Sequence, residues 1–206
     1  MNKILTLPNF LTILRILLTP LFLYFLFNRY PFFEIFALLI FVVASVTDAY
    51  DGYFARKNAT VTTLGKFLDP LADKVLMSAA FISFVVLKLV PLWMVIIVIL
   101  RDFIVTGIRI VMSLNDNPMV TRKSAKIKTG VQIGIVCFIL FYRITQRWKI
   151  FLGISEYVRL VENYHIIEGL MFLVTLFTLW TGIEYCVINF SSIKALWRHE
   201  TKNIIE

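Results

Sequence analysis

The sequence predicts an all-α integral membrane protein whose residues 1–206 form one domain with six transmembrane helices. Apolar residues make up 59% of the chain and charged residues only 17%, whereas a soluble domain is about half apolar and about a quarter charged. The mean hydropathy is +0.82. The apolar residues come in blocks of about 20, the length that a helix needs to cross a bilayer. These observations disfavour the alternative, a soluble helical domain with an unusually apolar core.

Each apolar block is expected to form one transmembrane helix, after a short interfacial segment at the N-terminus. The blocks are joined by short polar loops, apart from a longer connection around residues 147–163, which we expect to cap the non-cytoplasmic side. No repeat or soluble domain interrupts them. The expected spans are roughly 8–27, 33–57, 64–88, 91–114, 124–146 and 164–188.

The distribution of Lys and Arg predicts the orientation of the chain. Cytoplasmic loops of membrane proteins carry an excess of both residues. Eleven of them lie near the chain termini, in the even-numbered loops or near the block ends beside these loops, and six lie in the odd-numbered loops or near the block ends beside them. Both termini are therefore expected in the cytoplasm. The net charge of +8 is then explained by anionic lipid rather than by a nucleic-acid partner.

Four aspartates interrupt the second and third blocks. Asp48 and Asp51 are three residues apart near the end of one block, and Asp69 and Asp73 are four apart near the start of the next. On helices both spacings put the side chains on one face. Because consecutive spans are antiparallel, the two pairs are expected to meet at a similar depth, close to the cytoplasmic surface.

Such a cluster needs positive charge. A carboxylate at the bilayer centre costs about 2.5–3.5 kcal/mol on insertion scales, and neighbouring carboxylates also repel one another. Arg56, Lys66 and Lys74 offset part of this cost. Convergent carboxylate oxygens are the ligands that hard divalent cations prefer, and two Mg²⁺ ions would neutralise four aspartates. Two-metal sites serve phosphoryl transfer. The alternative is that the aspartates are helix-end residues in contact with interfacial water.

Small residues accompany the aspartates. Gly52 follows Asp51 directly, Ala55 lies on the same helix face, and Gly65 precedes Asp69 by four residues. Glycine destabilises a helix interior, so these positions favour either close helix packing or the close approach of a flat ligand. Arg56 is either a counter-ion of the carboxylates or a ligand of a diphosphate.

The segment "DAYDGYFARKNATVTTLGKFLDPLAD" resembles the signature of the CDP-alcohol phosphotransferase family, D-x2-D-G-x2-A-R-x8-G-x3-D-x3-D. All eight fixed positions are matched, by Asp48, Asp51, Gly52, Ala55, Arg56, Gly65, Asp69 and Asp73. The family consists of integral membrane enzymes with six transmembrane helices, usually homodimers. The resemblance therefore implies a membrane enzyme. We expect it in a bacterial cytoplasmic membrane, and the Lys and Arg distribution predicts that its active site faces the cytoplasm.

The resemblance also implies roles for the motif residues. Two Mg²⁺ or Mn²⁺ ions would bind the diphosphate of a CDP-linked lipid. Their ligands would be Asp48, Asp51, Asp69 and Asp73. Asp73 would also be the general base, although metal coordination weakens a carboxylate as a base.

Binding of the donor follows from the same resemblance. The cytidine would lie in the space left by Gly52, Ala55 and Gly65, and Arg56 would contact the diphosphate. Asp48 would take part in CDP binding as well as in metal coordination.

Three further segments are similar to the branch of this family that uses sn-glycerol 3-phosphate as acceptor. They are "LPNFLTILRI", "LRDFIVTGIR" and "SAKIKTGVQ"; the third departs from the pattern at Ala125, where glycine is expected. The resemblance implies transfer of a phosphatidyl group from CDP-diacylglycerol to glycerol 3-phosphate, with release of CMP. The acceptor phosphate would be bound by Thr106, Arg109, Lys126 and Lys128, with Asn9, Thr12, Arg15 and Arg101 in supporting roles.

Several alternatives stay open at this point. Lys126 and Lys128 also fit the ordinary basic flank of a cytoplasmic helix end, and Arg101 is expected to pair with a carboxylate such as Asp102. Another acceptor would make the chain a cardiolipin synthase or an inositol-phosphate or serine transferase. A divalent-cation transporter is a more distant alternative, for which inverted repeats would be expected.

Overall fold

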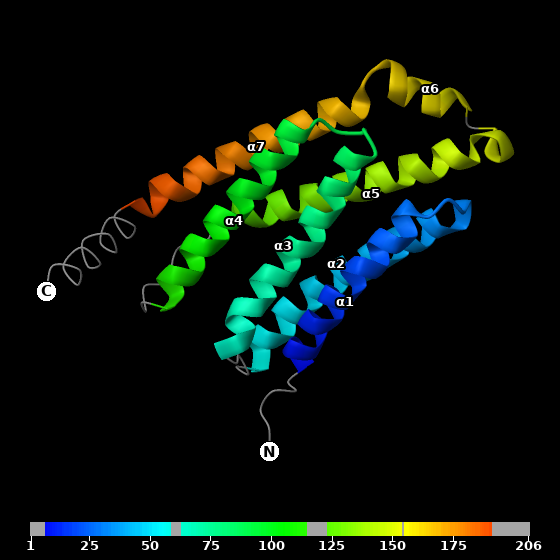
Figure 1. Cartoon of the computed structure of the whole chain (residues 1–206). Helices are drawn as coiled ribbons and strands as arrows, with labels where there is room; N and C mark the ends of the chain where they lie inside the picture. Colours follow the sequence, from blue (N-terminus) through cyan, green and yellow to red (C-terminus); the bar gives the residue numbers. More distant parts are fainter. Residues whose placement is uncertain (1–6, 59–62, 115–122, 154, 191–206) are drawn as a thin grey trace, which may run out of the picture.

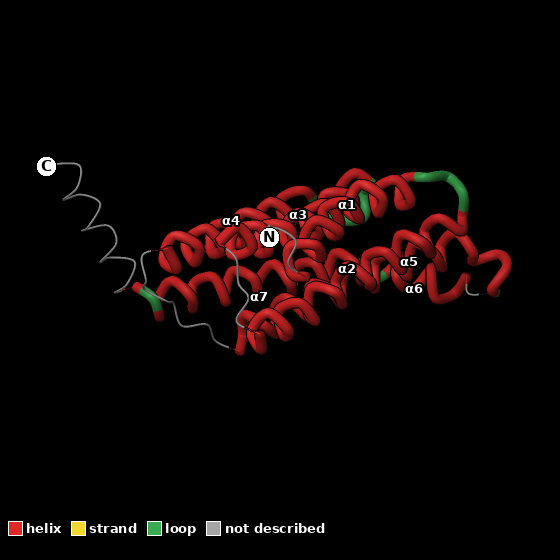
Figure 2. Tube along the Cα trace, turned by 90° about the horizontal axis from the view of Figure 1, so that it is seen from below, coloured by secondary structure: helices red, strands yellow, loops and turns green. Residues whose placement is uncertain are grey.

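The structure is a computed structural model that describes residues 7–58, 63–114, 123–153 and 155–190. These residues form seven α-helices and no strand, which confirms the predicted all-α class. The helices are α1 (Leu7–Phe27), α2 (Pro31–Asn58), α3 (Thr63–Val86), α4 (Leu92–Leu114), α5 (Lys123–Leu152), α6 (Ser155–Asn163) and α7 (Ile166–Ile188). The six long helices run along one elongated bundle, and the short α6 lies at one end of it (Figure 1 and Figure 2).

The contacts between helices divide the bundle into two groups, α1 with α2 and α4 with α7, and α3 and α5 join these groups. Helix α1 packs against α2 and α3, whereas α4 packs against α3 and α7. Helix α5 contacts both α2 and α7. The start of α1, the end of α2 and the start of α3 lie together at the end of the bundle opposite α6 (Figure 1).

The core is made of large apolar side chains that interdigitate between these helices. Phe22, Phe41, Phe81, Phe84 and Ile139 are all fully or almost fully buried. Apolar residues continue on the outer faces of the helices, where Leu17, Leu173, Trp180 and Val187 are 62–69% exposed. A soluble protein rarely presents so much apolar surface, so this outer surface is suited to contact with lipid.

Within the described ranges, two helical segments are long and apolar enough to cross a bilayer. They are Ile127–Trp148 in α5 and Ile166–Ile188 in α7. Helix α4 has a similar length but carries Arg101, Asp102 and Arg109, and charged side chains inside a membrane are expensive unless they are paired. The number of six spans stays a prediction, while the six long helices themselves lie where the sequence places them.

A buried ion-pair cluster fixes α5 to α2 near the α6 end of the bundle. Oε1 of Glu34 accepts hydrogen bonds from Nη2 of Arg143 at 2.8 Å and from Nε of Arg147 at 2.9 Å. Arg147 also donates from Nη1 to the backbone oxygen of Arg29, at 2.7 Å. Because Arg143 and Arg147 are four residues apart, one helix face presents both guanidinium groups to the same carboxylate.

Most of the connection around residues 147–163 is helical, namely residues 147–152 and 155–163. The first of them complete α5, and α6 follows with Val158 and Val161 buried. Glu162 of α6 accepts a hydrogen bond from Tyr142 at 2.9 Å and one from Gln146 at 3.2 Å. Helix α6 is therefore fastened to α5 by side-chain hydrogen bonds as well as by its two buried valines.

The turn between α3 and α4 is fixed by a hydrogen-bonded helix end. The amides of Lys88 and Leu89 donate to the carbonyls of Val85 and Phe84, both at 2.9 Å, which is the Schellman arrangement. Lys88 has φ 58°, a left-handed conformation that glycine adopts more easily. Pro91 follows and prevents the helix from continuing.

Candidate active site

The positions of the four motif aspartates lie on two neighbouring helices. Asp48 and Asp51 belong to the last part of α2, and Asp69 and Asp73 to the first half of α3. Because both segments are helical, spacings of three and four keep each pair on one side of its helix. The two helices contact each other, and these positions lie toward the end of the bundle opposite α6 (Figure 1).

Most of the residues to which the sequence analysis assigned a role have side chains that the structure does not describe. This applies to Asn9, Thr12, Asp48, Asp51, Gly52, Ala55, Arg56, Gly65, Asp69, Asp73 and Lys126. Their metal, CDP, acceptor and supporting roles stay predictions. Among the described residues, no group of three or more His, Cys, Asp and Glu is arranged to hold a metal ion. Arg15, whose side chain is described, is buried in α1 at 3% exposure.

A buried polar network is centred on Asp102 of α4. Nζ of Lys128 donates to Oδ1 of Asp102, and Nε2 of Gln132, on the same face of α5, donates to Oδ2 at 3.3 Å. Nη1 of Arg101 lies 3.3 Å from Oδ1, which confirms the expected pairing of Arg101 with Asp102. One carboxylate thus joins α4 to α5 inside the bundle.

This network borders the aspartate motif. Lys74 of α3 directly follows Asp73, and its charge acts on the carboxylate of Asp102. Among the described side chains, Arg101 and Lys128 contact Asp102 directly, and the charge of Lys74 also acts on it. The network therefore extends to the residue that follows the last motif position.

Arg109 lies two turns beyond Arg101 on α4. Its Cζ is 5.7 Å from the centroid of the Tyr185 ring on α7, within the range of a cation–π interaction. Arg109 is exposed, and no described side chain engages it in a hydrogen bond or ion pair. Thr106, one turn earlier on α4, is half-buried. The hydrogen-bond donors of Arg109 are thus available to a ligand.

The two lysines predicted to bind the acceptor phosphate do not share a helix face. Helix α5 begins at Lys123, so Lys126 and Lys128 are both helical and their positions differ by about 200° around the axis. Lys128 lies on the buried side with Gln132 and is 3% exposed. A joint role of the two lysines at one phosphate stays a prediction.

Helix α7 supplies residues that the sequence analysis missed. Thr181 accepts a hydrogen bond from Nη2 of Arg101 at 2.9 Å, and Gly182 lies directly against the Arg101 side chain. Tyr185 contacts Arg109 as described. Taken singly, none of these residues is unusual in an apolar span. Their spacing of three and four residues places them on a single helix face, and this pattern could have identified them as a contact face.

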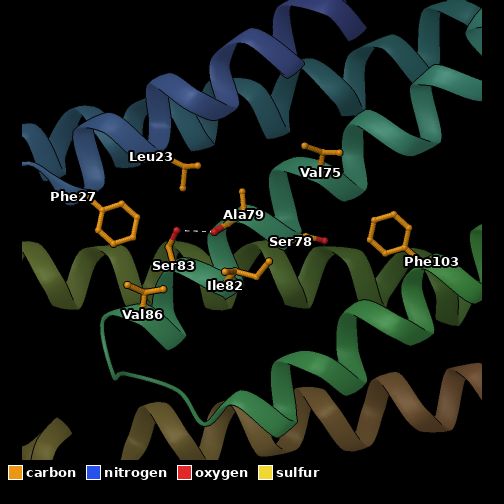
Figure 3. Close-up of a pocket in the computed structure, with 9 residues that line it drawn as sticks. All are labelled: Leu23, Phe27, Val75, Ser78, Ala79, Ile82, Ser83, Val86 and Phe103. Atoms are coloured by element: carbon orange, nitrogen blue, oxygen red, sulfur yellow. Dashed lines mark hydrogen bonds between the residues drawn. The ribbon is translucent and has the colours of Figure 1, made fainter.

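An apolar pocket between α1, α3 and α4 is separate from this site. Its volume is about 400 Å³, and it is lined by Leu23, Phe27, Val75, Ser78, Ala79, Ile82, Ser83, Val86 and Phe103 (Figure 3). Ser83 donates a hydrogen bond to the backbone oxygen of Ala79, at 2.7 Å. The lining positions of α3 lie about 130° around the helix from positions 69 and 73. The pocket is therefore directed away from the motif face.

A family comparison covers most of the chain. The sequence profile of a family described as CDP-alcohol phosphatidyltransferase matches residues 5–183. The chain belongs to the CDP-alcohol phosphatidyltransferase family. The match includes the motif helices α2 and α3, the network helices α4 and α5, and most of α7. It confirms the resemblance carried by the eight motif positions.

Curated relatives within the family agree with one another in name. A CDP-diacylglycerol–glycerol-3-phosphate 3-phosphatidyltransferase of Bacillus subtilis is 34% identical over 200 residues, 91% of this chain and 97% of the relative. A protein of the same name from Rickettsia bellii is 37% identical over 127 residues, 62% of this chain and 70% of the relative. A probable phosphatidylglycerophosphate synthase of Mycobacterium tuberculosis is 34% identical over 142 residues, 67% of this chain and 68% of the relative.

Membership of this family establishes the general class of the protein. CDP-alcohol phosphatidyltransferases are membrane-bound enzymes, and the two long apolar helices of this chain agree with that setting. The chain is thus a membrane transferase, and the alternative of a divalent-cation transporter is not supported.

Proposed function

We propose that this protein transfers the phosphatidyl group of CDP-diacylglycerol to sn-glycerol 3-phosphate, forming phosphatidylglycerophosphate and CMP. The observation that carries the proposal is the cationic network next to the aspartate motif. Lys74 connects the two, because it follows Asp73 in α3 and acts on Asp102 of α4. An acceptor with its own phosphate needs this kind of positive surroundings, and the named relatives use such an acceptor.

The donor diphosphate would be held through divalent metal ions. Four carboxylates on two contacting helices are a donor set that suits Mg²⁺ or Mn²⁺, and two ions would balance their charge. When bound, the ions supply electrostatic stabilisation of the diphosphate and of the leaving oxygen. The proposed ligands are Asp48, Asp51, Asp69 and Asp73.

The motif also contains the residues proposed to bind the CDP part of the donor. The small residues Gly52, Ala55 and Gly65 would leave room for the cytidine, and Arg56 would bind the diphosphate together with Asp48. Guanidinium groups bind phosphate oxygens through paired hydrogen bonds.

The acceptor reacts through its primary hydroxyl. The hydroxyl oxygen forms a bond to the phosphatidyl phosphorus, the bond from that phosphorus to CMP breaks, and Asp73 takes the hydroxyl proton. Arg109 would bind the acceptor phosphate, with contributions from Thr106, Lys126 and Lys128. Because Lys128 is buried against Asp102, its contribution would be to the local field more than to direct contact.

We further propose how the protein sits in its membrane. The Lys and Arg distribution places both termini and the motif end of the bundle on the cytoplasmic side of a bacterial inner membrane. The family resemblance supports a homodimer. Cysteine labelling of single-cysteine variants at the two ends of the bundle, in intact cells, would test this orientation.

An assay of acceptor-dependent CMP release tests the proposed function. Purified protein in detergent–lipid micelles is incubated with CDP-diacylglycerol and Mg²⁺, and CMP release is followed with and without sn-glycerol 3-phosphate. We expect release to depend on that acceptor and phosphatidylglycerophosphate to form. Stimulation by phosphatidylglycerol, inositol phosphate or serine, but not by glycerol 3-phosphate, would instead assign another acceptor within the family.

A further inference from the structure

One buried face of α7 and of the residue that follows it carries polar and small side chains. Thr178, Thr181, Gly182, Tyr185 and Asn189 recur every three or four residues and are all buried. Polar groups buried in a membrane helix are expected to have partners on neighbouring helices. This face packs along α4, the helix that carries the arginines of the candidate acceptor site.

The first contact point of this face is Arg101. Nη2 of Arg101 donates to Oγ1 of Thr181 at 2.9 Å, and Oγ1 of Thr181 in turn donates to the backbone oxygen of Thr178 at 3.0 Å. A Cβ atom added at Gly182 would lie only 3.1 Å from Cγ of Arg101. The absence of a side chain at Gly182 thus leaves the space in which the arginine stem lies.

The second contact point is Arg109. The guanidinium carbon lies 5.7 Å from the ring centroid of Tyr185, and the ring itself is 6% exposed. A buried ring under an exposed guanidinium supports the cation from one side and leaves its N–H groups directed to other ligands. Tyr185 is therefore placed to restrict where Arg109 can lie without occupying its hydrogen-bond donors.

We propose that Tyr185 is a positioning residue for the acceptor site, which holds the guanidinium of Arg109 where it binds the acceptor phosphate. Helix α7 then forms the side of the site next to α4, and it contributes to the affinity for phosphorylated acceptors. This inference rests on the proposed function. It adds α7 to a site whose residues predicted from the sequence lie between positions 9 and 128.

The test compares two replacements of the ring. Tyr185→Leu removes the aromatic face and is expected to raise the KM for sn-glycerol 3-phosphate roughly three- to thirtyfold, the range that a cation–π contact provides. The KM for CDP-diacylglycerol and kcat should change less than twofold. Tyr185→Phe keeps the aromatic face, so its acceptor KM should be at least threefold below that of the leucine variant.

Two controls separate positioning from a general structural effect. Trp180→Leu removes an aromatic side chain from the outer face of α7, where it is 68% exposed, and should leave both KM values unchanged. In a background of Arg109→Gln, Tyr185→Leu should raise the acceptor KM by less than twofold, because the group that Tyr185 positions is gone.

The possible results are distinguishable. If the wild-type protein releases CMP in response to glycerol 3-phosphate but Tyr185→Leu keeps the acceptor KM, the role of Tyr185 is wrong and the function stands. The role of Tyr185 would also be wrong if Tyr185→Leu raised the KM values for CDP-diacylglycerol and glycerol 3-phosphate equally. The same holds if Tyr185→Leu raised the acceptor KM as much in the Arg109→Gln background as in the wild type. If the wild-type protein does not respond to glycerol 3-phosphate, the proposed function itself fails.

Discussion

Lys128 of α5 donates a hydrogen bond to Asp102 of α4, and both side chains are almost completely buried. The pair connects the helix that carries Arg101 and Arg109 to the helix that follows it. It also explains how α4 can keep Arg101 and Asp102 inside the bundle, since a buried carboxylate paired with cations is compensated.

The buried pair predicts an asymmetric response to substitution. Asp102→Asn leaves Lys128 buried without an ionic partner and should destabilise the protein by about 3–5 kcal/mol. Lys128→Met should cost less, because Asp102 keeps Arg101 at 3.3 Å. Combining the two changes should recover stability relative to Asp102→Asn alone.

Thermal unfolding in detergent, followed by circular dichroism, measures these effects. Glu156→Gln, which changes an exposed carboxylate of α6, is the matched control and should leave the midpoint unchanged. If Asp102→Asn unfolds at the same temperature as this control, the pair does not stabilise the bundle.

The Glu34 cluster predicts a loss of stability without a loss of substrate binding. Glu34→Gln leaves Arg143 and Arg147 without their shared carboxylate and should destabilise the protein by about 3 kcal/mol. The cluster lies near α6, at the other end of the bundle from the motif positions (Figure 1). The KM for glycerol 3-phosphate, measured below the unfolding temperature, should therefore stay within twofold, and a larger rise would show that the two ends are coupled.

Periodicity and hydropathy predict most of the fold. The expected spans and the observed long helices agree closely at their starts, because helix length and loop composition were both clear in the sequence. The end of α5 was missed by six residues, since the basic segment after position 146 resembles a loop. In the structure the helix continues to Leu152, and the hydrogen bonds of Arg143 and Arg147 to Glu34 fix this part of α5 to α2.

The site was predictable only where its residues are close in sequence. The aspartate spacing and the pairing of Arg101 with Asp102 follow from helix geometry and charge. Lys128 lies 26 residues after Asp102, and their hydrogen bond depends on the tertiary arrangement that brings α4 and α5 within reach of each other. The spacing of Thr181 and Tyr185 marks one face of α7, but their contacts with the arginines of α4 depend on the return of α7 to that helix, which the spacing does not specify.

The α3–α4 turn predicts a stabilising substitution. Lys88 has φ 58°, and a non-glycine residue in this region costs roughly 1–2 kcal/mol. Lys88→Gly should therefore raise the free energy of unfolding by about 1 kcal/mol, visible as a higher unfolding midpoint. Lys88→Ala, which removes the charge but keeps a Cβ atom, is the control. An equal rise in the alanine variant would attribute the effect to the lysine side chain rather than to the backbone.

Removal of divalent metal should abolish the proposed reaction and leave the fold in place. Chelation with EDTA is expected to lower CMP release at least about a hundredfold, because the diphosphate and the leaving oxygen lose their electrostatic stabilisation. Mg²⁺ or Mn²⁺ should restore it. Asp69→Asn should weaken Mn²⁺ binding, measured directly by electron paramagnetic resonance, whereas the Glu156→Gln control should bind Mn²⁺ as the wild type does. Undiminished Mn²⁺ binding by Asp69→Asn would remove this residue from the ligand set, and full turnover in EDTA would remove the metals from the reaction.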